Sequence, residues 1–302
     1  MPRLTGNGEQ AAMAPLSGDK DALPLPVCEQ PVDVRGGGKD APSSGQDSIA
    51  EEVPVAMVYN GVSHAVMMAS PCHLDDFALG FSLSEGILQR TDQLFTIDVN
   101  PVADGIVVNL HIAGDCFARL REQRRNMAGR TGCGLCGTES LAHVIRALPA
   151  VAAQPMPADQ VIQHALHNLE EHQPLQMQTG ATHGAAWCNA EGDIVLVRED
   201  VGRHNALDKL IGARLRQCGS QAFADGFALI SSRASFEMVQ KSASVGIGTL
   251  AAVSAPTALA IREARNSGMN LIGFLRPGRH VIYTRSAEHP RKTETGRGQS
   301  HE

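Results

Sequence analysis

The 302-residue sequence is poor in aromatic side chains, which make up 4% of it and include one Trp and two Tyr. A hydrophobic core must therefore be built from Val, Ile, Leu, Ala and Met, and a hydrophobic content of 43% is ample for one. No stretch approaches the roughly 18 consecutive apolar residues that a membrane-spanning helix needs, and no solenoid-type repeat is present. We therefore expect a globular protein of one large domain or two small ones.

Signals of secretion and of bulk anion binding are also lacking. The first twenty residues contain no apolar run that resembles a signal peptide. Seven cysteines, an odd number scattered widely, do not resemble a secreted disulfide framework. A net charge of −6 argues against a nucleic-acid binder and against a protein of anionic membrane surfaces. We expect a cytoplasmic protein without nucleic-acid or membrane partners, in which a local basic pocket for a phosphorylated ligand remains open.

Both ends of the chain lack apolar periodicity. Residues 1–48 are rich in Gly, Pro, Ser and charged side chains, and residues 286–302 are polar, so we expect two disordered tails. Residues 49–126 are predicted to form a smaller β-rich subdomain with one helix. In it, two β-rich runs flank Asn60-Gly61, a strong hairpin signal. The helix is predicted from apolar residues at helical spacing, namely Leu74, Phe77, Ala78 and Phe81.

Residues 141–285 alternate between strand and helix patterns, most regularly from residue 191 onward. This alternation predicts an α/β domain with a mostly parallel sheet that helices cover on both faces. In such sheets, ligands bind outside the carboxyl ends of the strands. We therefore interpret 141–285 as an α/β ligand-binding domain.

Polar residues follow each of the predicted strands of this sheet. If the strands are adjacent and parallel, these side chains lie along one rim and suit a phosphate or nucleotide pocket. The alternative, that each is a loop residue that bonds to its own turn, stays open. The residues in question are Arg203 and His204 after the first strand, Ser231 and Arg233 after the second, Ser254 after the third, and Arg276 and Arg279 after the fourth.

One motif carries reactive side chains, the Cys-x-x-Cys of Cys133 and Cys136 in the stretch GRTGCGLCGTESL. A structural zinc site needs four ligands, so His183, His204 or other cysteines would have to complete it. Zinc-deaminase chemistry is disfavoured because Ala185 stands where the catalytic glutamate of an H-x-E motif would be. The helix expected after Cys136 fits a thioredoxin-like redox pair, but the glycines beside both cysteines do not, because a redox disulfide is usually held more rigidly.

A nucleophilic thiolate is the third use of the pair, and the flanking residues favour it. Glycines bracket both cysteines, which suits a mobile loop over residues 127–140. Thr138 is placed to cap a following helix in which Leu141, Val144, Ile145 and Leu148 have helical spacing. A helix start and nearby arginines both lower a thiol pKa and stabilise a thiolate or a persulfide. The upstream arginines are Arg119, Arg121, Arg124, Arg125 and Arg130.

Several stretches together resemble the FdhD family, the accessory sulfurtransferases of formate dehydrogenase. The resemblance extends over about residues 50–285. The matching stretches are MASPCHLDDFALGFSLSEGIL at 68–88, GCGLCG at 132–137, TGATHGAA at 179–186, REDVGRHNALDKLIG at 198–212, SSRASFEMVQKSA at 231–243 and GFLRPGR at 273–279.

This resemblance implies a cytidine-deaminase-like layered α/β fold without the deaminase metal, and a homodimer. It further implies a carrier that accepts sulfur from a cysteine desulfurase as a persulfide on Cys133 or Cys136. The carrier passes it to the molybdenum bis-guanine-dinucleotide cofactor, for which GDP is a mimic, to serve formate dehydrogenase. The alternative is a cofactor-binding chaperone whose cysteines are structural or bind metal. The family's cofactor-binding segment falls on Phe274, Leu275, Arg276, Pro277, Gly278 and Arg279.

Overall fold

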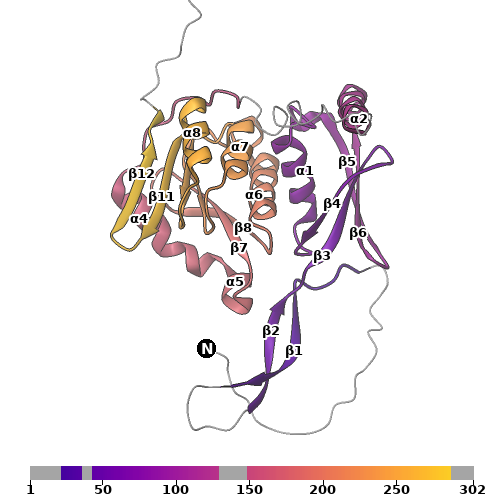
Figure 1. Cartoon of the computed structure of the whole chain (residues 1–302), viewed down its shortest axis with the longest axis horizontal. Helices are drawn as coiled ribbons and strands as arrows, with labels where there is room; N and C mark the ends of the chain where they lie inside the picture. Colours follow the sequence, from indigo (N-terminus) through magenta and orange to yellow (C-terminus); the bar gives the residue numbers. More distant parts are fainter. Residues whose placement is uncertain (1–21, 36–42, 129–147, 287–302) are drawn as a thin grey trace, which may run out of the picture.

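The protein consists of two lobes, each built on a β-sheet (Figure 1). The computed structural model describes residues 22–35, 43–128 and 148–286. The N-terminal half forms a four-stranded sheet, and the C-terminal half forms a six-stranded sheet. Two helices, one from each half, lie between the sheets and join the lobes (Figure 1).

The four-stranded sheet has the order β4-β3-β6-β5. The predicted hairpin at Asn60-Gly61 is confirmed, because both residues have the positive φ angles of a tight turn, 46° and 80°. The predicted helix over Leu74–Phe81 is confirmed as α1, which packs on the inner face of this sheet. The elements are β3 Val53–Tyr59, β4 Val62–Ala69, α1 Leu74–Ser84, η1 Thr91–Gln93, β5 Leu94–Val102, β6 Gly105–Ile112 and α2 Gly114–Ala128.

The six-stranded sheet has the order β12-β11-β10-β9-β7-β8. Its strands are β7 His183–Cys188, β8 Ile194–Asp200, β9 Phe227–Ile230, β10 Thr249–Ala252, β11 Asn270–Arg276 and β12 Arg279–Thr284.

The expectation of a mostly parallel sheet is wrong. Only β9-β10 and β10-β11 pair in parallel, while β7 pairs antiparallel with both β8 and β9, and β12 pairs antiparallel with β11. The physical reason is β7, a short strand of small, buried side chains that lies between the first two predicted strands. Because β7 is antiparallel to both neighbours, β8, β9, β10 and β11 still run in the same direction.

Helices cover both faces of this sheet, as the alternation predicted. Side chains of α6, α7 and α8 form one core with Trp187 and the other residues of that face. Ile162, Ala165 and Leu169 of α4 pack on the opposite face. No helix among the described residues has the length and apolarity to cross a membrane. The helices are α4 Asp159–Leu169, η2 Glu170–His172, α5 Pro174–Thr179, α6 Arg203–Cys218, η3 Gly219–Gln221, α7 Phe236–Ser244 and α8 Ala258–Ser267.

The two lobes meet where α1 crosses α6 in backbone contact. A Cβ on Gly80 of α1 would overlap the carbonyl oxygen of Asp208 in α6. A Cβ on Gly212 of α6 would likewise overlap the carbonyl oxygen of Asp76 in α1. These two glycines therefore set how closely the lobes approach.

Part of the expected N-terminal tail is ordered. Residues Val27–Val34 (β1) and Ser43–Ala50 (β2) pair antiparallel, with Val27 opposite Ala50 and Val34 opposite Ser43. The expectation of disorder through residue 48 is wrong for these strands, because an eight-residue ladder satisfies backbone groups that a search for apolar periodicity does not register. Figure 1 shows this hairpin projecting from the body. Residues 1–21 and 287–302 lie outside the described residues.

Candidate functional site

The carboxyl ends of β8, β9, β10 and β11 lie along one edge of the six-stranded sheet, because these strands run in the same direction. Asp200 and Arg276 are the last residues of β8 and β11. His183, the first residue of the antiparallel β7, pairs with Asp200 and so lies at the same edge. The polar residues that follow these strands therefore share one edge of the sheet, although β7 separates β8 from β9.

The beginning of α6 places a basic cluster at this edge. Gly202 is the N-cap, and Arg203 and His204 form the first turn. Burial lowers the pKa of His204, and the Arg203 charge lowers it further. The pKa of His183 is lowered by burial and by Arg203 in the same order. Both imidazoles therefore bind a proton less readily than an ordinary histidine, although Glu237 lies 3.5 Å from His204 Nε2.

A buried ion pair fixes the position of this turn. Asp200 and Lys209 are both fully buried, with 2.6 Å between the carboxylate and the ammonium. Lys209 Nζ donates to the Ser70 carbonyl at 2.9 Å, and the Ser70 amide donates to Asp200 at 3.0 Å. Asn205 Nδ2 donates both to the Met68 carbonyl and to Asp200. The start of α6 is thus hydrogen-bonded to the end of β4 in the other lobe.

The end of β9 contributes hydroxyl groups and one arginine. Ser231 Oγ accepts a hydrogen bond from the Gly184 amide at 2.9 Å, and the Ser231 amide donates to the Gly184 carbonyl at 2.9 Å. The Ser231 hydroxyl is therefore held against β7, and only its remaining hydrogen-bonding capacity is available to a ligand. Arg233 is exposed, two residues further along.

The end of β11 presents an aromatic ring to solvent. Phe274 is 43% exposed and has a positive φ of 52°, which is uncommon for a bulky residue. Its amide donates to the Ser254 carbonyl after β10. Arg276 folds back along the edge, and its Nη1 donates to the carbonyls of Val253 and Leu275 at 2.6 and 2.7 Å.

The turn between β11 and β12 completes the segment that the family resemblance singled out. Pro277 and Gly278 form the turn, and Gly278 has a positive φ of 74°. The Gly278 amide donates to Gln163 Oε1 of α4 at 2.8 Å. Arg279 is exposed and lies opposite Arg276 in the antiparallel pairing of β11 with β12. Leu275 is buried in the core, so its side chain does not face solvent.

The expected site residues share one edge but form two groups along it. Neighbouring strands lie about 4.8 Å apart, so the ends of β8 and β11, four strand spacings apart in the sheet, are roughly 19 Å from each other. One group lies at β8 and β9 and comprises Arg203, His204, Ser231 and Arg233. The other comprises Phe274 to Arg279. The interpretation of a single convergent pocket is therefore too compact.

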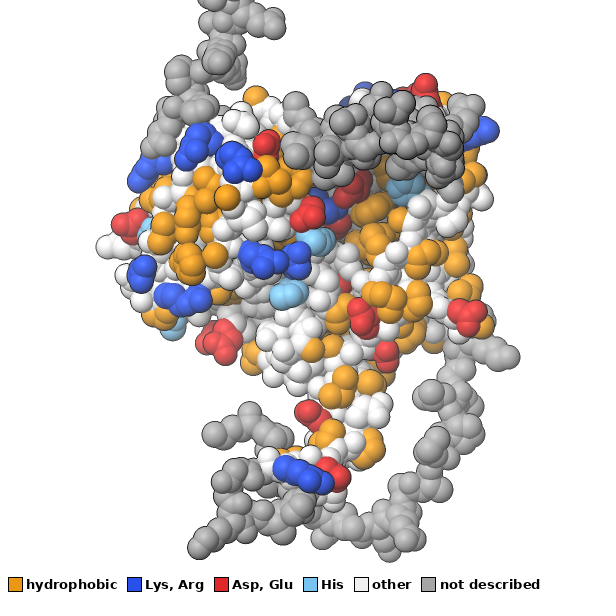
Figure 2. All heavy atoms as spheres, in the orientation of Figure 1, with side chains coloured by type: hydrophobic (Ala, Val, Ile, Leu, Met, Phe, Trp, Pro, Cys, Tyr) orange, Lys and Arg blue, Asp and Glu red, His pale blue; other side chains and the backbone are white. Residues whose placement is uncertain are grey.

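The arginines at this edge have no carboxylate within ion-pair distance among the residues that the structure describes. By contrast, Arg198 lies 2.8 Å from Asp76. Figure 2 shows Lys and Arg side chains gathered over the six-stranded lobe, with His side chains beside them near the junction of the lobes. Unpaired guanidinium groups are suited to phosphate. The arginines are Arg203, Arg233, Arg276 and Arg279.

A second buried lysine, missed by the sequence interpretation, lies at the junction of the lobes. Lys241 Nζ of α7 lies 2.9 Å from Asp208 of α6 and 2.6 Å from Glu85 after α1. Burial alone would lower the pKa of Lys241, but the two carboxylates outweigh it and raise the pKa. A hollow of about 330 Å³ beside it is lined by Phe81 and His204, among others. The signal in the sequence was a charged residue on the apolar face of a predicted helix.

The cysteine pair Cys133 and Cys136 lies outside the described residues. The expected loop over 127–140 begins too early, because Met127 and Ala128 belong to α2. On that helix Arg119 pairs with Asp115 at 3.0 Å. Among the described residues, no cluster of His, Cys, Asp and Glu is suited to hold a metal ion.

The remaining cysteines are free thiols: Cys28, Cys72, Cys116, Cys188 and Cys218. Cys116 and Cys188 are buried, and burial raises the pKa of Cys188 to about 12. Burial also raises the pKa of Cys72, although the Lys209 charge opposes the shift. A thiolate is therefore disfavoured at Cys72 and Cys188.

Comparison with known proteins gives a consistent assignment. A model of the FdhD/NarQ family matches residues 50–289. The chain is 54% identical over 248 residues to the sulfur carrier protein FdhD of Cupriavidus necator, which covers 82% of this chain and 84% of that protein. It is 56% identical over 252 residues to the sulfur carrier protein FdhD of Bordetella petrii, with 83% and 89% covered.

The fold also has a counterpart among solved structures. A crystal structure described as that of a formate dehydrogenase accessory protein from Desulfotalea psychrophila superposes with a TM-score of 0.64. The two chains are 24% identical, and the match covers 86% of this chain and 96% of the other. At that identity the likeness supports the fold alone.

Proposed function

Because the chain belongs to the FdhD/NarQ family, we propose that it carries sulfur as a cysteine persulfide from a cysteine desulfurase to the molybdenum bis-guanine-dinucleotide cofactor of a formate dehydrogenase. The curated relatives reported above are named sulfur carrier proteins. In this proposal Cys133 and Cys136 carry the sulfur, the edge of the six-stranded sheet holds the cofactor, and the working unit is a homodimer.

The observation that carries the proposal is the row of arginines without carboxylate partners along the carboxyl edge of β8–β11. A protein that served only as a cysteine-based sulfur relay would need no such edge. A bis-dinucleotide contains two pyrophosphates, and charge-assisted hydrogen bonds from guanidinium to phosphate are among the stronger polar contacts in proteins. The edge extends roughly 19 Å from the end of β8 to the end of β11, which suits a ligand with two separate phosphate-bearing arms.

The sulfur step needs a thiolate and no external redox reagent. The thiolate of the carrier attacks the outer sulfur of the desulfurase persulfide. The sulfur–sulfur bond of the donor breaks, and its electron pair stays on the desulfurase cysteine, which leaves as a thiolate. A new persulfide forms on the carrier, so the outer sulfur moves without a net change in oxidation state. The carrier persulfide then holds this sulfur for delivery to the cofactor.

The other thiols compete poorly for this step. Burial raises the pKa of Cys72 and Cys188, which disfavours their thiolates. Cys116 is fully buried and so inaccessible to a sulfur donor. Cys218 is exposed and Cys28 half-buried, but each is a single thiol without a neighbouring cysteine in the sequence. The Cys-x-x-Cys pair is therefore the best-placed carrier that the chain contains.

Phe274 gives the cofactor edge an aromatic platform. Its positive φ and its 43% exposure turn the ring outward from a strand that is otherwise buried at Leu271 and Ile272. A base stacked on such a ring gains about 1–3 kcal/mol. With Arg276 and Arg279 beside it, this end of the edge suits a guanine base and its phosphates.

The experiment that tests the sulfur-carrier role is mass spectrometry of the full chain after incubation with a cysteine desulfurase and cysteine. We expect the mass of one additional sulfur on the peptide that contains Cys133 and Cys136, and loss of this adduct in Cys133→Ser. The matched control is Cys218→Ser, which removes an exposed thiol elsewhere and should leave the adduct in place.

Two other outcomes point elsewhere. If Cys136→Ser alone removed the adduct, the two cysteines would have exchanged roles. If wild-type protein took up no sulfur and held zinc in stoichiometric amount, the chain would be a cofactor-binding chaperone with structural cysteines, and the sulfur-carrier proposal would fail.

A further inference from the structure

A hollow of about 390 Å³ lies between the start of α4 and the turn that joins β11 to β12. Its lining comes from α4 and from the β11–β12 hairpin, and comprises Asp159, Gln163, Gly278, Arg279, His280 and Ile282. Gly278 and Arg279 also belong to the segment from Phe274 to Arg279, so the hollow adjoins one end of the candidate cofactor edge. Its size is that of a small-ligand site and is ample for one purine base.

A chain of hydrogen bonds fixes the orientation of the polar groups in this hollow. The Gly278 amide donates to Gln163 Oε1 at 2.8 Å, so Gln163 Nε2 is turned toward His280 and lies 3.3 Å from its Nδ1. Because an amide nitrogen is only a donor, His280 Nδ1 accepts and the ring proton is on Nε2. That Nε2 lies 3.1 Å from Asp159 Oδ1 and donates to it.

Asp159 is the end of this chain and the group in it that a ligand can reach. Its side chain is 82% exposed, whereas that of His280 is 9% exposed. A carboxylate has about four lone-pair sites, and His280 uses one of them. The exposed carboxylate is therefore held in place by a buried donor and still has acceptor capacity for a ligand.

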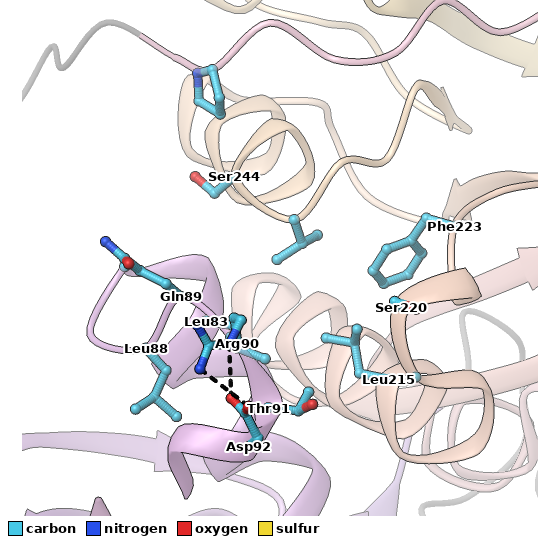
Figure 3. Close-up of a pocket in the computed structure, with 14 residues that line it drawn as sticks. Leu83, Leu88, Gln89, Arg90, Thr91, Asp92, Leu215, Ser220, Phe223 and Ser244 are labelled. Atoms are coloured by element: carbon cyan, nitrogen blue, oxygen red, sulfur yellow. Dashed lines mark hydrogen bonds and ion pairs between the residues drawn. The ribbon is translucent and has the colours of Figure 1, made fainter. Parts of the chain in front are cut away.

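A larger groove at the seam between the lobes lacks such a group. This groove, of about 840 Å³, includes Asp92 in its lining, but Arg90 donates to both carboxylate oxygens at 3.0 and 3.1 Å (Figure 3). Leu88, Leu215 and Phe223 make much of its surface apolar (Figure 3). The smaller hollow is therefore the better candidate for recognition of a polar ligand.

A carboxylate that is held by one hydrogen bond suits the Watson–Crick edge of guanine. That edge presents two adjacent donors, N1–H and the 2-amino group, and the two oxygens of one carboxylate can accept from both. Hydrogen bonds to an ionised acceptor are stronger than those between neutral groups. Adenine has a lone pair at N1 and no 2-amino group, so it would repel the same carboxylate.

The other lining residues suit the remainder of a nucleotide. Ile282 offers apolar contact to a base, and the planar guanidinium of Arg279 can stack on a base or bind a phosphate. The hollow thus combines a carboxylate for the donor edge of a base with a cation for the phosphates that follow it.

We propose that Asp159 is the residue that selects guanine over other bases, and that His280 and Gln163 are positioning residues that hold its carboxylate. The inference rests on the proposed function, because it concerns the guanine of the ligand assigned to this edge. It goes beyond that function in naming the residue that determines base preference and the change that reverses it.

Calorimetric titration of the full chain with four nucleoside diphosphates that differ only in the base tests this inference. The four are the diphosphates of guanosine (GDP), inosine (IDP), xanthosine (XDP) and adenosine (ADP). Loss of one hydrogen bond to a charged group weakens binding roughly tenfold or more. We therefore expect the wild-type protein to bind GDP best, IDP more weakly because it lacks the 2-amino group, and ADP more weakly still.

Asp159→Asn should reverse the preference between guanine and xanthine. The new amide oxygen can accept from His280 and from N1–H of the base, which leaves the amide nitrogen as a donor. Xanthine has an acceptor oxygen where guanine has the 2-amino group, so it matches the variant. We expect GDP to bind roughly tenfold or more weakly and XDP to bind better than GDP. Impaired folding cannot produce such a gain.

Asp193→Asn is the matched control. Asp193 also lies within hydrogen-bond distance of a histidine, 2.9 Å from His164, but it belongs to the β7–β8 connection at the opposite edge of the sheet. This variant should keep the wild-type order of affinities. His280→Phe tests the positioning role, because it removes the donor to Asp159. It should lower the ratio of GDP to IDP affinity without creating a preference for XDP.

The outcomes separate this inference from the function on which it rests. If the wild-type protein binds GDP best and Asp159→Asn still prefers GDP to XDP, the inference fails and the cofactor edge stands. Equal affinity of the wild-type protein for all four diphosphates also overturns the inference, because no residue then selects the base. If the wild-type protein binds none of them, both the inference and the assignment of the edge to the cofactor fail.

Discussion

At the scale of single residues, the edge of the six-stranded sheet combines arginines that lack carboxylate partners with histidines whose pKa values are lowered. Arg203 lowers the pKa of both His183 and His204 after burial has already done so. Repulsion from the Arg203 guanidinium therefore disfavours further positive charge on these two histidines. An anion bound there would offset that repulsion, so anion binding and protonation of the two histidines should favour each other.

Replacing the edge arginines should weaken nucleotide binding. A hydrogen bond between charged groups contributes about 1.5–3 kcal/mol, so each Arg→Ala change that removes a phosphate contact should weaken GDP binding roughly tenfold or more. The variants are Arg203→Ala, Arg233→Ala, Arg276→Ala and Arg279→Ala, and calorimetric titration with GDP is the measurement.

Arg265, in the last turn of α8, offers a matched control, because this exposed arginine lies away from the carboxyl edge. Arg265→Ala should bind GDP as the unmodified protein does. If only one group of edge variants responds, that group holds the nucleotide. Unchanged affinity in all four would show that the edge is not the binding site.

The two histidines predict how binding depends on pH. In the folded protein their pKa values lie below the ordinary value of about 6.5. Protonation therefore favours the unfolded chain: its cost to folding is absent above about pH 6.5 and grows as the pH falls toward the folded pKa values. A bound phosphate stabilises the imidazolium form, so binding and proton uptake are linked.

GDP affinity should consequently rise as the pH is lowered from 7.5 to 6, more steeply for wild type than for a His183→Gln, His204→Gln double variant. Comparison of the two proteins at each pH removes the titration of the nucleotide itself. Parallel pH profiles would show that neither imidazole senses the ligand.

At the scale of elements, local patterns predicted most strands and helices well. The apolar spacing over Leu74–Phe81 became α1, and Asn60-Gly61 became a hairpin turn. The strand β7 was not predicted, because its run of small residues, Gly184 to Ala186, has neither an alternating pattern nor β-branched side chains. The β1–β2 hairpin was also not predicted, because it is held by backbone pairing that leaves no apolar pattern in the sequence.

The helix crossing predicts a stability effect. In Gly80→Ala the new methyl group would meet the Asp208 carbonyl, so α1 and α6 would have to separate. Overpacking of this kind costs about 1–3 kcal/mol, measurable as a lower urea midpoint. Gly114→Ala is the control, because a Cβ there has no atom within 4 Å. An equal midpoint for both variants would mean that the crossing tolerates a side chain.

At the scale of the whole molecule, the order of strands was the part that the sequence could not specify. Which strands become neighbours depends on long-range contacts, such as the pairing of His183 with Asp200, which leave no local pattern. The shared edge was nevertheless predictable, because it follows from strand direction alone. The role of that edge as a ligand site stays a prediction.

The lobes should unfold together. Two buried lysines bind across the junction, Lys209 to the Ser70 carbonyl and Lys241 to Glu85, and α1 interlocks with α6. We expect a single transition in which fluorescence of Trp187, buried in the six-stranded lobe, coincides with loss of exchange protection in β6 of the other lobe. Two separated transitions would show that the junction does not couple the lobes.

The separation of the two groups along the sheet edge also bears on selectivity. A mononucleotide would contact only part of this edge, whereas a ligand with two linked nucleotide arms could engage both of its ends. Once the first arm is bound, the second is present at a high effective concentration, so the combined affinity can exceed that of either arm by factors of about 10²–10⁴. The spacing between Arg203 and Arg276 would then favour binding of the complete double-armed ligand over its fragments, even when the fragments are far more abundant.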